Sequence, residues 1–323
     1  MEDKMNSDEL DQIFDEDKLN RAIKKGKRKS TIRTVLISIL IACLVFVLIT
    51  LGNTALTINM SNKTFESLSA YIELTVPNGY ISNSADTLGF LGGRSNYTIS
   101  RTVGNKIVVL EERVQPFGLL PQFIMTRGQG GGQVAGEWPL NCWEFGYNKM
   151  LFFLPQITYK EYKNDLAELS QIGSDKLIEV GLSFDKPYTF SELSHILPNA
   201  NISWYWVDTF TKDDMVRYEK EAKECDGKAT FISEFETLGV DKTPPISINT
   251  FDSDYNNFLY NLKISKNQKF LNIFNNLNSK GYTDPSKVPI LGAIAYGTKE
   301  QLKPLIENPH IKASSFGVIT EKY

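Results

Sequence analysis

The sequence predicts a membrane-anchored protein of the α+β (or α/β) class, with a single N-terminal transmembrane helix, then a β-rich region and a C-terminal domain. An uncharged apolar run at residues 35–52 is long enough for a helix to cross hydrocarbon, which takes about 18 residues or more. Short β-rich runs follow between turn signals, and the last part of the chain contains two strand–helix–strand units. The predicted regions are a cytoplasmic tail at 1–33, the transmembrane helix at 34–56, an extracytoplasmic β-rich region at 57–160 and an extracytoplasmic domain at 165–323.

Basic residues flank the apolar run on one side only. They are Lys24, Lys25, Lys27, Arg28, Lys29 and Arg33, and no Lys or Arg occurs from position 34 to position 62. Because positive charge stays cytoplasmic, we expect the N-terminus inside, the C-terminus outside, and the basic block against the anionic inner face of the bilayer. A cleaved signal peptide has a shorter apolar core near the extreme N-terminus. Lipidation at Cys43 is disfavoured because an apolar stretch follows it.

The N-terminal tail carries a small apolar stripe beside an acidic block. Leu10, Ile13 and Phe14 fall at i, i+3 and i+4, which is one face of a helix. A segment this short cannot bury the stripe by itself. The tail is therefore either disordered or a helix that folds against a partner, and in the second case these three residues form the contact.

Strands and turns are predicted from residue 61 to about residue 116, with weak alternation at 70–76. Pro77, Asn78 and Gly79 form a turn signal. The β-rich runs at 97–101 and 106–110 flank residues 103–105, which predicts a hairpin. The glycine-rich segment 128–132 lacks the Lys-Ser/Thr of a phosphate-binding loop and is interpreted as a flexible loop.

The C-terminal domain is predicted from two helix starts of the same kind. Thr189 with Glu192, and Thr298 with Gln301, have the spacing of a capping box. The helices at 189–197 and 298–306 would connect strands at 176–184, 201–210, 288–296 and 311–319, and a longer helix is expected at 254–276. Parallel pairing with right-handed crossovers is the default for such units, so we expect an α/β sheet or a ferredoxin-like α+β sheet.

Composition and motifs argue against several function classes. The net charge of −3 does not favour nucleic-acid binding, and no Cys/His spacing indicates a zinc site, so no metal or cofactor is expected. No catalytic motif is present, and Glu111 and Glu112 would face opposite sides of a strand; we expect no enzyme. Cys142 and Cys225 could form a disulfide outside the cell, but nothing local supports their pairing.

Two segments resemble a known family. Residues 17–30 and 32–38 read DKLNRAIKKGKRKS and IRTVLIS, and together with the apolar run they resemble the sigma factor regulator N-terminal domain. Residues 179–189 and 204–208 read EVGLSFDKPYT and WYWVD and resemble the C-terminal domain of the same proteins. The resemblance covers roughly residues 15–110 and 165–320. It implies a membrane-bound anti-sigma factor of Gram-positive bacteria.

The resemblance implies that an extracytoplasmic-function sigma factor is held inactive at the membrane until an envelope signal arrives. Another membrane subunit or a protease would be a further partner. Many anti-sigma factors have a larger cytoplasmic helical domain, often with a zinc motif, and this tail has neither. Contact would therefore be made by a short helix or through another subunit. The alternative is an envelope-facing binding or scaffold module with no sigma partner.

Overall fold

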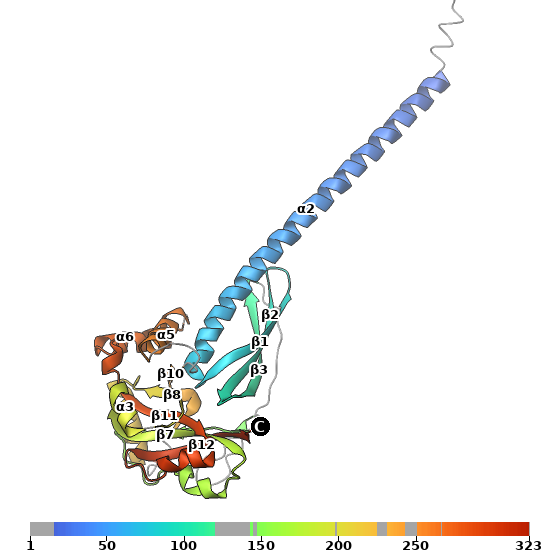
Figure 1. Ribbon diagram of the computed structural model, residues 1–323. Coiled ribbons are helices and arrows are strands. Elements are labelled where there is room, and N and C mark those ends of the chain that lie inside the picture. Colours follow the sequence, from blue (N-terminus) through green and yellow to red (C-terminus); the bar gives the residue numbers. More distant parts are fainter. Residues whose placement is uncertain are drawn as a thin grey trace, which may run out of the picture. The chain divides into compact units, whose positions relative to one another are not determined.

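The computed structural model describes residues 16–119, 143–144, 147–197, 199–224, 231–242, 251–265 and 267–322 (Figure 1). The chain divides into two compact units, Met1–Asn59 and Met60–Tyr323. The α+β class predicted from the sequence is confirmed: one long helix is followed by β-sheets with several helices.

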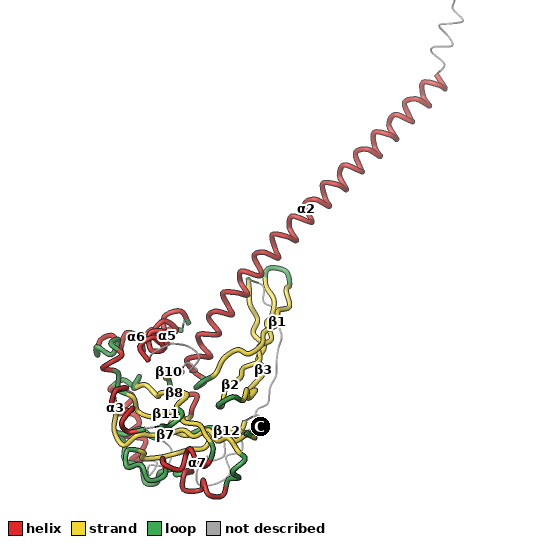
Figure 2. Tube along the Cα trace, in the orientation of Figure 1, coloured by secondary structure: helices red, strands yellow, loops and turns green. Residues whose placement is uncertain are grey.

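Helix α2 (Glu16–Thr75) contains the predicted membrane span (Figure 2). An 18-residue window of it has a mean hydropathy of 3.0, and none of that window is buried by protein. The helix is therefore long and apolar enough to cross a membrane.

The same helix corrects the prediction of strands from residue 61. Residues 61–75 are helical because no Pro or Gly occurs between Gly52 and Pro77. Pro77 cannot continue a helix and disfavours helical backbone in the residue before it. Asn78, at φ 56°, then turns the chain into the first strand, so the predicted turn at 77–79 is confirmed.

A three-stranded antiparallel sheet follows in unit 2. It has the order β1 (Gly79–Leu88), β2 (Gly92–Val103) and β3 (Lys106–Gly118). The predicted hairpin at 103–105 is confirmed, since Val103 pairs with Lys106. Gly104 has φ 61° and Asn105 does not have a positive φ, which is the pattern of a type II′ turn.

The second sheet has five strands, all antiparallel, in the order β10-β8-β11-β7-β12 (Figure 1). Its strands are β7 (Lys176–Tyr188), β8 (Ile202–Val207), β10 (Gly239–Asp241), β11 (Ile290–Gly297) and β12 (Ile311–Glu321). β11 lies between β7 and β8, and β7 lies between β11 and β12. The two strands of each predicted strand–helix–strand unit are thus separated by a strand from the other unit. The expected parallel pairing within each unit is therefore wrong, and the ferredoxin-like arrangement is right.

Both predicted capping boxes are present. Helix α3 (Phe190–Ile196) starts where Glu192 accepts from the Thr189 N–H at 2.7 Å. Helix α7 (Lys299–Leu302), continued by η4 (Lys303–Leu305), starts where Gln301 accepts from the Thr298 N–H at 2.9 Å.

The helix predicted at 254–276 is two helices, α5 (Phe251–Ile264) and α6 (Gln268–Ser279). The Asn267 side chain accepts from Lys269 N, which caps a new helix rather than continuing the old one. Helix α4 (Lys212–Glu224) was not predicted. It is mostly polar, and of its apolar face only Ala222 is fully buried, with Met215 and Tyr218 partly buried beside it. Its signal is a third cap of the same kind, in which Thr211 and Asp214 exchange hydrogen bonds.

Apolar side chains cover both faces of the five-stranded sheet. One face packs against α3, α5, α6 and α7. The other packs against residues 150–159 and α4, and Trp204 and Trp206 are buried there as core residues. Ile202 groups with Tyr205 and Val207 on the first face, although strict alternation from Trp204 would place it on the second. The register of β8 shifts beside it.

Short elements complete the described fold. They are β4 (Trp143–Glu144), β5 (Tyr147–Asn148), β6 (Leu151–Phe152), β9 (Ile232–Ser233), and the 3-10 helices η1 (Asp165–Gln171), η2 (Glu234–Glu236) and η3 (Pro285–Lys287).

Candidate functional site

The residues singled out in the sequence are not gathered in one site. The membrane-orienting residues all lie exposed on α2: Lys24, Lys25, Lys27, Arg28, Lys29 and Arg33. Three groups of expected residues lie outside the described ones: the contact residues Leu10, Ile13 and Phe14, the glycine-rich segment 128–132, and the cysteines Cys142 and Cys225.

The two histidines have separate surroundings. His195 is exposed on α3. The Nδ1 of His310 shares a 2.8 Å hydrogen bond with the hydroxyl of Tyr188. Within the described ranges, no three His, Cys, Asp or Glu side chains lie close enough together to hold a metal ion.

A buried ionic cluster that the sequence analysis missed lies in unit 2. Arg101 of β2 donates to Glu179 of β7 at 3.0 Å and to Glu234 of η2 at 3.0 Å. The three side chains are at most 1% exposed. Met150 N donates to Glu234 and Val318 N donates to Glu179. The cluster therefore ties β2 to two elements that are far away in the sequence.

The electrostatics of this cluster follow from burial and proximity. Burial lowers the pKa of Arg101, but Glu179 and Glu234 raise it by more, so the guanidinium stays charged. Burial raises the pKa of Glu179 against the opposing effect of Arg101. A sequence signal did exist: Ile99, Arg101 and Val103 alternate at period two, which placed Arg101 among core positions.

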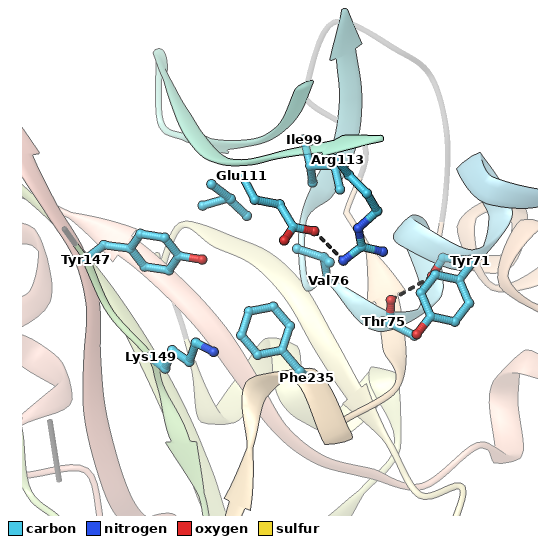
Figure 3. Close-up of a pocket in the computed structure, with 10 residues that line it drawn as sticks. Tyr71, Thr75, Val76, Ile99, Glu111, Arg113, Tyr147, Lys149 and Phe235 are labelled. Atoms are coloured by element: carbon cyan, nitrogen blue, oxygen red, sulfur yellow. Dashed lines mark hydrogen bonds and ion pairs between the residues drawn. The ribbon is translucent and has the colours of Figure 1, made fainter. Parts of the chain in front are cut away.

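A cavity of about 270 Å³ opens beside the cluster (Figure 3). Three groups of residues from unit 2 line it. Tyr71, Thr75 and Val76 come from the end of α2 and the turn after it, and Ile99, Leu110, Glu111 and Arg113 come from β2 and β3. The third group is Tyr147 and Lys149, from β5 and just after it, with Phe235 from η2.

Charged groups of both signs and aromatic rings meet in this cavity. Glu111 and Arg113 form an ion pair on β3. The Lys149 ammonium lies 4.3 Å from the centroid of the Phe235 ring. Tyr147 connects the cavity to the buried cluster, because its ring lies 6.0 Å from the Arg101 guanidinium.

Charges, hydroxyls and aromatic rings around a concavity are suited to recognising a ligand. Burial raises the pKa of Tyr147, so its hydroxyl stays protonated at neutral pH and can donate a hydrogen bond. The cavity therefore has the groups needed to bind a small polar molecule.

Two family models match the chain. The family described as Sigma factor regulator N-terminal matches residues 20–108, and the one described as Sigma factor regulator C-terminal matches residues 169–318. Among curated proteins, the chain is similar to the probable anti-sigma-M factor YhdL of Bacillus subtilis (strain 168). The identity is 21% over 309 residues, covering 91% of this chain and 80% of that protein. No solved structure is significantly similar to the chain.

The matched ranges contain nearly all of α2, all of β1 and β2, and nearly all of the five-stranded sheet. Four polar residues of the cavity lie between the two ranges: Glu111, Arg113, Tyr147 and Lys149. The family match therefore says nothing about what the cavity binds.

Proposed function

We propose that this chain, which belongs to the sigma factor regulator family, is a membrane-anchored anti-sigma factor. It restrains an extracytoplasmic-function sigma factor and senses the envelope through its outer domains. The observation that carries the proposal is the match of both family domains, in order, on a chain that also contains one helix able to cross a membrane. The similarity to a probable anti-sigma-M factor supports the same role.

The proposed topology is a single pass with the N-terminus in the cytoplasm and unit 2 outside. It is supported by the one-sided basic flank of the span, from Lys24 to Arg33, since positive residues are retained on the cytoplasmic side.

The proposed contact with the sigma factor is the apolar stripe of the tail: Leu10, Ile13 and Phe14. An amphipathic segment that cannot bury its own apolar face gains stability by laying that face into a groove of a partner. The acidic residues around the stripe would add charge contacts at the rim.

The proposed sensor is unit 2. The last turns of α2 belong to its core, where Ile72 is fully buried and Leu74 is 2% exposed. A conformational change in unit 2 would thus act on the same helix that contains the span. Release would follow by that change or by proteolysis.

The test is a pull-down of the tagged full-length protein from its native membrane, compared with a form lacking residues 1–16. We expect a sigma factor with the intact tail only. The double variant Leu10→Asp with Ile13→Asp should derepress a reporter of the sigma regulon. Asn6→Asp with Gln12→Asp adds the same charge at polar positions and should not. A sigma factor absent from both pull-downs would refute the proposal and favour an envelope-binding module.

A further inference from the structure

The cavity beside the Arg101 cluster presents charges of both signs to its interior. We propose that it binds a small zwitterion, namely a free amino acid or a dipeptide, whose ammonium is held by Glu111 and whose carboxylate is held by Arg113 and Lys149. The inference names the ligand class for the sensing role proposed above and rests on that role for its biological meaning.

The volume limits the ligand. At about 270 Å³, the cavity lies at or just below the lower end of the range for small-molecule pockets, roughly 300–1,000 Å³. It therefore suits a ligand of amino-acid or dipeptide size better than a cofactor or a longer peptide.

The charges argue for a ligand with both signs. Figure 3 shows Glu111 and Arg113 entering from β3, and Lys149, Tyr147 and Phe235 on the facing wall. Glu111 and Arg113 already neutralise each other. Their side chains are partly exposed, at 26% for Glu111 and 37% for Arg113, so both are open to a ligand. A ligand with a single charge can pair with only one of them. A zwitterion gives each of them a new partner.

The placement of the charges points the same way. Glu111 supplies a negative group to the lining, and Arg113 and Lys149 supply positive groups. Separated positive and negative groups are complementary to a ligand that is charged at both ends.

The apolar part of the cavity selects the side chain. Phe235, Tyr71 and Tyr147 supply aromatic surface, and Ile99 and Leu110 supply aliphatic surface. Aromatic rings attract one another by about 0.5–1.5 kcal/mol beyond simple burial. An aromatic or large aliphatic side chain on the ligand is therefore favoured.

The test is calorimetric titration of the full-length protein in detergent micelles. The probes are the twenty common amino acids, the dipeptide Ala-Phe, its N-acetyl form and its C-terminal amide. We expect a zwitterionic probe to bind, and each capped form of Ala-Phe to bind about tenfold more weakly or worse, because each cap removes one charge-assisted contact.

Variants and matched controls locate the binding. Glu111→Gln and Lys149→Met should each weaken binding about tenfold or more. Glu112→Gln changes the neighbouring carboxylate, which is exposed and does not line the cavity, and Lys106→Met changes a lysine outside it; both should bind as the parent does. The melting temperature of each variant establishes that it is folded.

Two results would overturn the inference. One is that no zwitterionic probe binds, and the other is that a capped form binds as tightly as Ala-Phe. The titration uses no sigma factor, so its failure leaves the anti-sigma role standing. Conversely, a failed pull-down leaves a positive titration intact.

Discussion

Arg101 is the positive centre of a buried cluster with two carboxylates, so its removal has a calculable effect on stability. Arg101→Met leaves Glu179 and Glu234 buried without their counter-charge, since all three side chains are at most 1% exposed. Breaking a buried pair by removing one partner costs roughly 3–5 kcal/mol. A domain near 250 residues loses about 2 °C of melting temperature per kcal/mol, so we expect a decrease of about 6–10 °C.

The assay is thermal unfolding of the full-length protein in detergent, followed by tryptophan fluorescence. Trp204 and Trp206 are buried in the five-stranded sheet and report on the unit that contains the cluster. The matched control is Arg217→Met, which removes an exposed ion pair with Asp214. Exposed pairs contribute at most about 1 kcal/mol, so the control should change the melting temperature by no more than about 2 °C.

A compensated variant separates charge from packing. Arg101→Met combined with Glu179→Gln and Glu234→Gln removes all three charges but keeps acceptors for Met150 N and Val318 N. It should regain most of the lost stability, because a buried network without charges has no unpaired ion to desolvate. The reasoning is refuted if Arg101→Met melts with the Arg217→Met control, or if the triple variant melts no higher than Arg101→Met.

Three further predictions concern single positions. Thr298→Ala should lower the free energy of unfolding by about 1 kcal/mol, measured by denaturant titration, whereas Thr298→Ser should not. Loss of solvation raises the pKa of Asp241 to about 8 in the folded protein. The stability that the folded protein gains from holding this proton is complete below about pH 4, and it is lost as the pH rises through about 8. Asp241→Asn should therefore flatten the fall in melting temperature over that interval, and an unchanged pH profile would contradict the assignment. Gly239→Ala would push a Cβ into the Tyr205 carbonyl oxygen and the Trp204 ring and should destabilise by about 1–3 kcal/mol. Gly26→Ala, with nothing within 4 Å, should not destabilise.

The parts of the fold that could be predicted from the sequence are those encoded by neighbouring residues. The apolar span and its basic flank depend on composition over some twenty residues. The turn at Gly104 and the caps at Thr298 and Gln301 depend on two to four residues. Each of these signals survives in the structure because it acts through local backbone geometry.

The parts that could not be predicted depend on residues far apart in the chain. Arg101 is 78 residues from Glu179 and 133 residues from Glu234. No local sequence pattern around one of these residues identifies the other two as its partners. The helical extension to Thr75 was missed because seven residues at 70–76 read equally well as a weak strand, and the decision depended on the absence of a helix breaker before Pro77.

The sequence by itself determined three things about this protein: it has one helix able to span a membrane, it has capped helices after that span, and it belongs to the sigma factor regulator family. Only the tertiary structure decided that β11 inserts between β7 and β8, and that the end of α2, the β2–β3 hairpin and Phe235 enclose one cavity. The physical reason is range. Capping, turns and hydropathy act over a few residues, whereas strand order and cavities are set by the burial of apolar surface across the whole domain.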